Sequence, residues 1–208
     1  MKISPWLLLL LALACASLAG CISPQPADLL EEARALQQQG DLPQSLEKYD
    51  EAIALHAHNS AAWAGRGEVL HLMGRDRDAL HSYNQSLSID PTSVNTWIRM
   101  GDVLAGVGQN EEAFYAYDRA IGLDPNATLA WNGVGEVWAR EGRYKDSAAA
   151  FSMVLRTNTS YSPAAKKLGD VLVELKEYEQ ALRSYEYALN ASPTYGEAAL
   201  AKGDLLSQ

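Results

Sequence analysis

Residues 94–127 read VNTWIRMGDVLAGVGQNEEAFYAYDRAIGLDPNA, and the next 34 residues, 128–161, read TLAWNGVGEVWAREGRYKDSAAAFSMVLRTNTSY. Aligned without a gap, the two stretches place Trp97 over Trp131 and Gly101 over Gly135. They also place Tyr117 over Phe151, so aromatic and small residues recur at fixed offsets. A repeat of this length is typical of arrays in which one supersecondary unit is stacked many times.

The 34-residue step extends over most of the chain and needs no insertion. Its columns are Trp63, Trp97 and Trp131; Gly67, Gly101, Gly135, Gly169 and Gly203; Gly40, Gly74, Gly108 and Gly142 with Lys176 as the exception; Ser45, Ala79, Ala113, Ser147 and Ala181; Tyr49, Tyr83, Tyr117, Phe151 and Tyr185; and Pro91, Pro125 and Pro193. The step predicts five units, 26–59, 60–93, 94–127, 128–161 and 162–195, and 196–208 supplies one more helix that would cap the array.

Each column has a structural role in a helical hairpin. The small residues of the Gly67 and Ala79 columns let the two helices of one unit approach closely, and the aromatic columns fill the gaps. The mid-unit glycines suit a turn that needs a positive φ or a helix C-cap. The prolines end the second helix, because proline has no backbone N–H to donate.

The columns resemble those of the tetratricopeptide repeat family, whose units carry Trp, Leu-Gly, Tyr, Ala, an aromatic residue and Pro at set offsets. The resemblance covers residues 26–208. It implies an all-α fold, a right-handed superhelical solenoid of helix-turn-helix repeats held by contacts between neighbouring units.

The composition is that of a folded globular chain, with 48% hydrophobic and 21% charged residues. The net charge of −9 and the absence of a basic stripe argue against nucleic acid as a partner. The only two cysteines are Cys15 and Cys21, so no disulfide can hold the repeats together.

The N-terminus has the layout of an export signal. Residues 1–20 contain one positive charge at Lys2, an apolar run over 6–14, and then small residues, which predicts a secretory signal peptide. The segment Leu18-Ala-Gly-Cys21 resembles the lipobox of prokaryotic lipoproteins, which implies cleavage before Cys21 and lipidation of its thiol.

The mature chain would then carry 16 basic and 26 acidic residues, a net charge of −10. Residues 21–25 would form a lipidated tether with a reach of at most about 17 Å, so the repeats would lie close to the membrane, facing outward. The alternative is an uncleaved transmembrane anchor, because residues 5–22 form 18 almost wholly apolar residues.

An acidic column follows the glycine of each first helix. It consists of Glu68, Asp102, Glu136, Asp170 and Asp204. The family resemblance implies that this position faces the concave groove, where charges would guide a basic peptide or protein segment. The alternative is a structural role, in which Arg99 meets Glu68, Lys167 meets Glu136, and Arg140 pairs with Glu136 along one helix.

Some family members grip a C-terminal carboxylate with lysine and asparagine from three consecutive units. In the first three units, Arg99 alone has suitable chemistry, with Asn95 and Asp102 beside it in the predicted groove. Later on, Asn132, Lys166 and Lys167 make only a partial and displaced imitation. We therefore expect no carboxylate clamp in the first three units.

Nothing in the repeats indicates catalysis, a cofactor or a small-molecule substrate. No Ser-His-Asp order and no glycine-rich phosphate loop occurs. The close pair His56 and His58 lacks a third ligand at suitable spacing, so we expect an exposed turn there and no metal site. The tryptophans and tyrosines, Trp138 included, fall on positions that we interpret as core.

Four Asn-x-Ser/Thr sequons start at Asn84, Asn126, Asn158 and Asn190. They are possible N-glycosylation sites, and they are equally explained by helix capping at the unit joins. For the whole chain we predict a membrane-anchored scaffold or adaptor that binds another protein and has no enzymatic activity. The alternative is an assembly lipoprotein, similar to a pilotin, that escorts subunits of an envelope complex.

Overall fold

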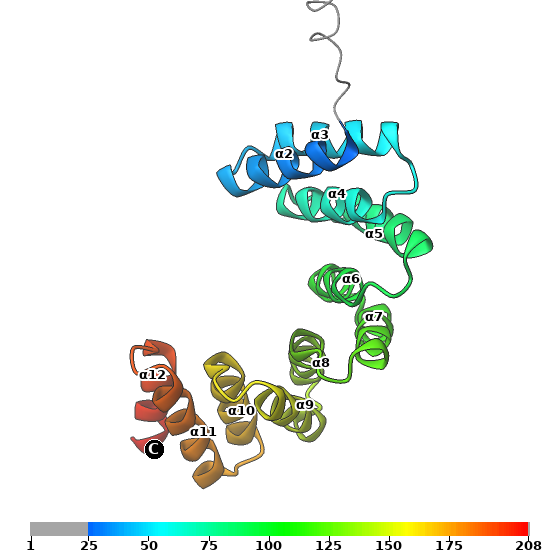
Figure 1. Ribbon diagram of the computed structural model, residues 1–208. Helices are drawn as coiled ribbons and strands as arrows, with labels where there is room; N and C mark the ends of the chain where they lie inside the picture. The colour runs from blue at the N-terminus through cyan, green and yellow to red at the C-terminus, as the bar shows by residue number, and fades with distance from the viewer. Residues whose placement is uncertain (1–24, 208) are drawn as a thin grey trace, which may run out of the picture. The chain divides into compact units, whose positions relative to one another are not determined.

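The computed structural model describes residues 25–207, which contain eleven α-helices and no β-strand (Figure 1). The predicted signal peptide, the lipidation site Cys21 and the alternative anchor over 5–22 lie outside the described residues. Within 25–207, no helix combines the length and the apolar character that crossing a bilayer requires. The predicted all-α fold is confirmed.

The helices come in pairs joined by short turns. They are α2 (Pro26–Gln39) and α3 (Leu42–Leu55); α4 (Ser60–Leu72) and α5 (Asp76–Ile89); α6 (Val94–Gly106) and α7 (Asn110–Leu123); α8 (Thr128–Arg140) and α9 (Tyr144–Thr157); α10 (Ser162–Glu174) and α11 (Tyr178–Ala191); and the single α12 (Gly196–Leu206). The chain divides into two compact units between His58 and Asn59.

The first compact unit contains the hairpin of α2 and α3. Its two helices pack along their length, and the hydroxyl of Ser45 on α3 donates to the carbonyl oxygen of Ala33 on α2 at 2.8 Å. Both residues are fully buried. The small residues predicted for the close approach of two helices lie where the helices meet.

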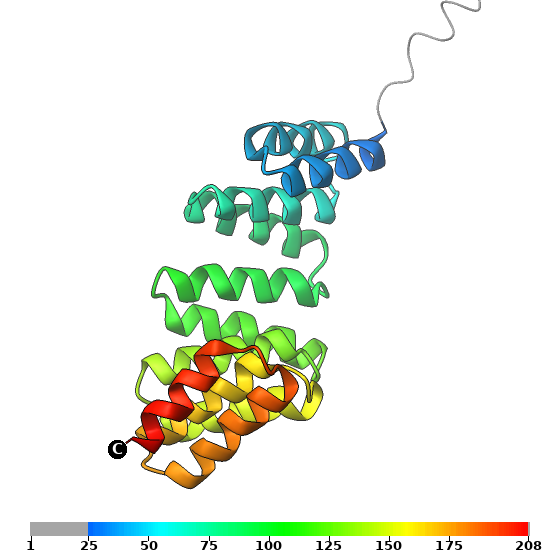
Figure 2. The ribbon, with the colours of Figure 1, turned by 90° about the vertical axis from the view of Figure 1, so that its left-hand side faces the viewer.

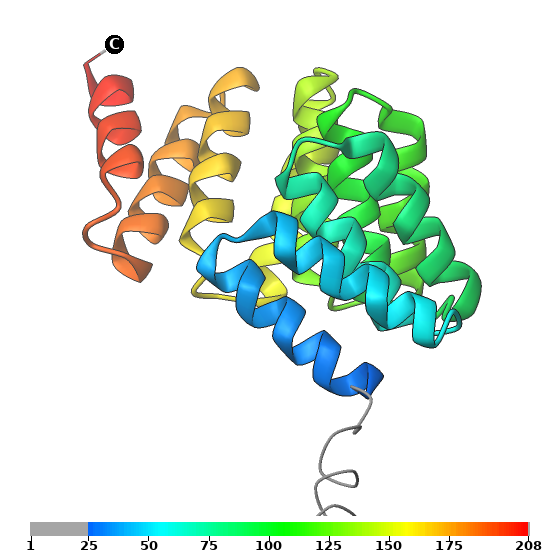
Figure 3. The ribbon, with the colours of Figure 1, turned by 90° about the horizontal axis from the view of Figure 1, so that it is seen from above.

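The second compact unit is a stack of hairpins. Within residues 59–207, the first helices α4, α6, α8 and α10 follow the inner side of a curve, and the second helices α5, α7, α9 and α11 follow its outer side (Figure 1). The helices of successive hairpins lie in layers in Figure 2, and α10, α11 and α12 lie in a row in Figure 3. This arrangement is a helical repeat solenoid.

An aromatic ring against a glycine holds each of these hairpins together. Tyr83, Tyr117, Phe151 and Tyr185 are almost fully buried. Their rings lie so close to the glycine of the preceding helix that a Cβ added at Gly101, for example, would stand 2.6 Å from Cε1 of Tyr117. The corresponding distance from Gly135 to Phe151 is 2.8 Å. The predicted role of the glycine and aromatic columns is confirmed.

The turns inside the hairpins have the predicted left-handed backbone. Gly40, Gly74, Gly108 and Gly142 have φ between 73° and 83°. Lys176 takes the same place with φ 61°, although an L side chain is disfavoured there. The turn geometry is therefore imposed by the packing of the two helices, even where glycine is missing.

In the third and fourth repeat units, the tryptophan of the first helix bonds to the loop that precedes the unit. The indole Nε1 of Trp97 donates to the carbonyl oxygen of Pro91 at 2.9 Å, and Trp131 does the same to Pro125 at 3.0 Å. In the fifth unit Ala165 replaces the tryptophan, and α10 packs more extensively on α9 than α8 does on α7. Contact between α8 and α10 is correspondingly slight compared with that between α6 and α8.

We predict that Gly101→Ala destabilises the fold by about 1–3 kcal/mol, because the new methyl group overpacks the site. The ring of Tyr117 has no room to move away, since a Cβ at Gly133 on its other side would already overlap Cζ of that ring. Urea unfolding followed by circular dichroism measures the change.

Gly122→Ala is the matched control. Gly122 lies in α7, and a Cβ there would meet nothing within 4 Å. The substitution should stabilise the helix by up to about 1 kcal/mol. Equal destabilisation by both variants would contradict the role given to the contact with Tyr117.

Candidate functional site

The inner side of the second compact unit contains a hollow of about 520 Å³ between α6, α8 and α10. Asp102, Asn132, Glu136 and Asp170 line it, together with Lys167 and Arg140. The hollow thus brings together four of the residues that the sequence analysis placed in the groove. Glu68, Asn95, Arg99, Lys166 and Asp204, also predicted for the groove, do not line the hollow.

Three of the five carboxylates in the acidic column form ion pairs. Glu68 pairs with Arg99 of the next unit at 3.5 Å, as the structural alternative predicted. Lys167 on α10 reaches back to Glu136 on α8, again as predicted, and its amine lies 3.4 Å from the side-chain oxygen of Asn132. Much of the acidic column is therefore neutralised by the protein itself.

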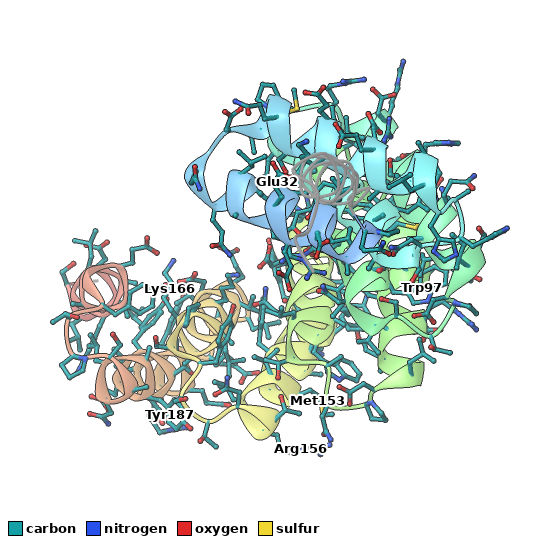
Figure 4. The ribbon with its side chains drawn as sticks, turned by 45° about the horizontal axis from the view of Figure 1, so that its top comes forward. Glu32, Trp97, Met153, Arg156, Lys166 and Tyr187 are labelled. Atoms are coloured by element: carbon teal, nitrogen blue, oxygen red, sulfur yellow. The ribbon has the colours of Figure 1, made fainter. Side chains whose placement is uncertain are left out.

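The third ion pair joins Lys166 and Asp170 of α10 at 2.8 Å. Figure 4 shows Lys166 on the side of α10 that faces α12. Burial lowers the pKa of its amine, and the hydrogen bond and negative charge of Asp170 outweigh burial, so the net pKa is raised. Lys166 is thus held as a cation beside the hollow.

The predicted pair of Arg140 with Glu136 is not formed. Arg140 donates instead to the carbonyl oxygen of Ala105 at 2.8 Å, from α8 to the C-terminal turn of α6. A guanidinium at this place satisfies a carbonyl group at a helix end. The bond joins neighbouring units, because Ala105 lies 35 residues earlier in the chain.

Asp102 has a different environment from the other carboxylates of the hollow. Among the described residues it forms no ion pair, and its carboxylate accepts a hydrogen bond of 2.8 Å from the hydroxyl of Tyr117. That hydroxyl reaches the hollow from α7 because Gly101 and Gly133 leave room for the ring. In the fifth unit, Tyr185 donates to Asp170 in the same way at 3.0 Å.

Asp102 is exposed to solvent, although neighbouring side chains remove part of the water around its carboxylate. This desolvation raises the pKa of Asp102, while the bond from Tyr117 and the positive charge of Arg99 act in the opposite direction. Burial also raises the pKa of Tyr117, so the phenol stays a hydrogen-bond donor at neutral pH. The hollow therefore contains a carboxylate that lacks a cation.

The sequence analysis missed Tyr117, Gly133 and Arg140 as parts of this site. The signal for Tyr117 was its hydroxyl, since a buried tyrosine needs a polar partner where phenylalanine does not. Phe151 in the next unit has no such group, and Glu136 is bonded by Asn132 at 2.7 Å and by Lys167.

Other predicted sites lie elsewhere. Among residues 25–207, no group of three or more His, Cys, Asp or Glu side chains could hold a metal ion. The sequon residues are all exposed, with Asn84 on α5, Asn190 on α11, and Asn126 and Asn158 in loops between units. Asn158 accepts hydrogen bonds from the backbone and hydroxyl of Ser160 at 3.2 and 3.0 Å within the loop, while the N-cap of α10 is Tyr161, without a side-chain bond.

Solved structures show the same fold at low sequence identity. A chain of Pseudomonas aeruginosa pilF is 18% identical with a TM-score of 0.79, over 88% of this chain and 83% of that chain. YrrB, a tetratricopeptide repeat protein with an unusual peptide-binding site, is 23% identical with a TM-score of 0.68, over 85% and 91% of the two chains. A thermophilic tetratricopeptide repeat protein of Thermus thermophilus is 14% identical with a TM-score of 0.68, over 88% and 100%.

These likenesses define the class as a solenoid of paired helices. None of the curated proteins compared matches the sequence. The family is given by the model of the tetratricopeptide repeat, which matches residues 30–94, 98–163 and 166–208. The chain belongs to the tetratricopeptide repeat family, as its columns predicted. Proteins of this family are in general non-enzymatic, and the repeats make this chain a scaffold for protein–protein interaction.

We predict that Asp102→Asn changes how stability depends on pH. A carboxyl group whose pKa is raised by folding stabilises the fold fully below its unfolded pKa, and this contribution is lost as pH rises through the folded pKa. The variant has no carboxyl group to ionise, so its stability does not fall in this way as pH rises. Its amide oxygen still accepts the bond from Tyr117.

Thermal unfolding should therefore show equal stability of variant and wild type near pH 3. Towards pH 7 the variant should become the more stable of the two. A wild type that gains stability over the variant as pH rises would contradict the desolvation of Asp102.

Proposed function

We propose that this protein is a lipid-anchored adaptor, displayed on the outer face of the cell membrane or in the envelope, that binds a basic segment of a partner protein in the hollow between α6, α8 and α10. The proposal combines two features. One is the lipobox at Cys21, which supports the anchor, and the other is the carboxylate of Asp102, which supports the choice of partner.

Asp102 carries the proposal for the partner. Asp102 is an exposed carboxylate that forms no ion pair among the described residues, so a positive group that enters the hollow can reach it and stabilise its charge. Lysine or arginine in a partner segment supplies such a group. The acidic chain, with a net charge of −9, would also attract a basic segment over longer distances.

The inner face suits a polypeptide ligand. The hollow is bounded by side chains from three successive first helices, so an extended segment would meet Asp102, Asn132 and Asp170 in turn. Hydrogen-bonding groups of both kinds are present, since Arg140 and Lys167 lie beside the carboxylates. YrrB, which shares the fold, has a peptide-binding site, and this supports a peptide as the kind of ligand.

We predict that Asp102→Lys weakens the binding of basic peptides about tenfold or more, because it replaces attraction by repulsion inside the hollow. The probe is a set of fluorescein-labelled octapeptides rich in lysine and arginine, with an acidic set of equal length for comparison. Fluorescence anisotropy at about 150 mM salt, close to physiological ionic strength, reports the affinity.

Asp204→Lys is the matched control, because Asp204 belongs to the same column, is exposed and lies outside the hollow. It changes the net charge by the same amount, and its effect should stay below about twofold. Equal losses in the two variants would mean that peptides respond to net charge alone, and the hollow would not be the binding site.

The anchor has its own test. A radioactive lipid precursor should label the wild type in a host that processes lipoproteins, and Cys21→Ser should lose the label, because the serine hydroxyl is a far weaker nucleophile. Cys15→Ser is the control and should keep it. Labelling that persists in Cys21→Ser would show that the lipobox is not used.

A further inference from the structure

A second hollow, of about 390 Å³, lies between α7 and α8. Phe114 and Tyr115 of α7 and Trp131 and Trp138 of α8 contribute aromatic walls to it. It shares no residue with the hollow between α6, α8 and α10. We call it the aromatic hollow, and it is a surface that the proposed function does not use.

The sequence analysis interpreted these aromatic residues as core, and the structure agrees only in part. Phe114 and Trp138 pack together with ring centroids 5.5 Å apart, yet both are only partly buried. Tyr115 is 60% exposed. Its ring meets that of Trp97 edge-on, with ring centroids 5.9 Å apart, so the rest of the tyrosine is open to solvent.

One carboxylate stands among the aromatic rings. Asp118 of α7 lines the aromatic hollow and is exposed. In the part of the chain that the structure describes, it has no hydrogen bond and no ion pair within 4 Å. Val134 of α8 lines the same hollow.

The repeat shows what an equivalent carboxylate binds. Two units further on, 68 residues from Asp118 and Val134, the chain has Glu186 on α11 and Lys202 on α12. There the amine of Lys202 donates to Glu186 at 2.8 Å. At the equivalent joint, then, this protein places a lysine amine against the acidic position of the second helix.

Three of the four aromatic walls, Phe114, Tyr115 and Trp138, belong to this one joint. One unit later, the residues in place of Phe114, Tyr115 and Trp138 are Ala148, Ala149 and Leu172, and one unit earlier they are Leu80, His81 and Leu104. The repeat therefore folds with aliphatic side chains at two of these three places in both neighbouring joints. The packing of the repeat therefore does not require these three rings and the carboxylate in this hollow.

Aromatic faces attract cations, and three tryptophan rings of this chain have a guanidinium group of the same chain beside them. The guanidinium groups of Arg66, Arg119 and Arg143 lie 5.8, 5.7 and 5.1 Å from the ring centroids of Trp63, Trp97 and Trp138. Among the described residues, Trp131 has no such partner. Arg119 and Arg143 do not line the aromatic hollow, and Arg143 is held by Asp146 at 2.7 Å.

We propose that the aromatic hollow binds a lysine side chain of a partner protein. Its amine would pair with Asp118, as Lys202 pairs with Glu186, and its four methylene groups would lie against Trp131, Trp138 and Tyr115. The rings add cation–π attraction to the ion pair. The proposal is independent of the proposed function, because it concerns a different side of α8 and none of the same residues.

The test follows the tryptophan indole N–H signals of the full chain by nuclear magnetic resonance, in a non-ionic detergent. The probe is Nα-acetyl-lysine methylamide, and the comparison compounds are its Nε-acetylated form and the arginine analogue. We expect the lysine probe to shift the signals of Trp131 and Trp138 with saturation at millimolar concentrations. The signal of Trp63 should not move.

Asp118→Asn should weaken this binding about fivefold or more, since it removes the charge that faces the amine. Glu186→Gln is the matched control, because it makes the same change of charge at the equivalent place, and it should leave the affinity within about twofold. Binding of the Nε-acetylated form as tightly as the lysine probe would overturn the proposal. So would tighter binding of the arginine analogue, which would assign the site to a guanidinium.

Val134→Lys tests the geometry in a second way. It introduces at α8 the lysine that α12 has at Lys202, so its amine should occupy the site beside Asp118 and abolish the shifts caused by the probe. Undiminished binding to a Val134→Lys protein whose Trp63 signal is unchanged would also overturn the proposal.

Discussion

The fold depends on the contact between a large ring and a glycine in each hairpin. The glycines lie so close to the rings that a Cβ atom on the glycine would overlap the ring; the rings are those of Tyr83, Tyr117, Phe151 and Tyr185. This contact sets the distance between the two helices of a pair and their relative position along the helix axes. Tyr117 also lies against Gly133 of the next hairpin, so here the ring also sets how two successive hairpins stack.

The same contact connects packing to the inner face. Since Tyr117 can lie between Gly101 and Gly133, its hydroxyl reaches from the outer row of helices to Asp102 in the hollow. Phe151 fills its place in the next hairpin without a hydroxyl, and there Lys167 and Asn132 bond the carboxylate of Glu136. In the fifth unit Tyr185 donates to Asp170 as Tyr117 does to Asp102, yet Asp170 also pairs with Lys166, so the hydroxyl alone does not exclude a cation.

Much of the fold could be predicted because packing at a fixed step leaves a direct mark on the sequence. The glycine and aromatic columns gave the hairpins, and Gly40, Gly74, Gly108 and Gly142 gave the turns. Lys176 shows the limit of that reasoning, since a residue unsuited to a positive φ adopts it where both neighbouring helices are already placed. Ion pairs between neighbouring units, such as Glu68 with Arg99, could also be predicted.

The remaining features could not be predicted, because they depend on which groups compete for one partner. Arg140 has Glu136 one turn away but donates to Ala105, whose carbonyl lies at a helix end in the neighbouring unit. The aromatic hollow could not be predicted, because the place of Trp131 in the tryptophan column indicated only a packing role. The open faces of Tyr115 and Trp138 become visible only when α7 and α8 are in place.

The replacement of tryptophan by Ala165 has a mechanical consequence. At the two preceding joints the indoles of Trp97 and Trp131 tie the layers together, and their size does not change with conditions. Where α10 lies against α9, the span from α8 to α10 is crossed by Lys167 and its bonds to Glu136 and Asn132. Charged bonds weaken as salt is added, but α9 and α10 also share an apolar core that includes Phe151, Val154 and Ala164, and this core holds the joint. The ionic strength around the protein therefore acts on the polar link between α8 and α10 and leaves the apolar contact between α9 and α10 unchanged.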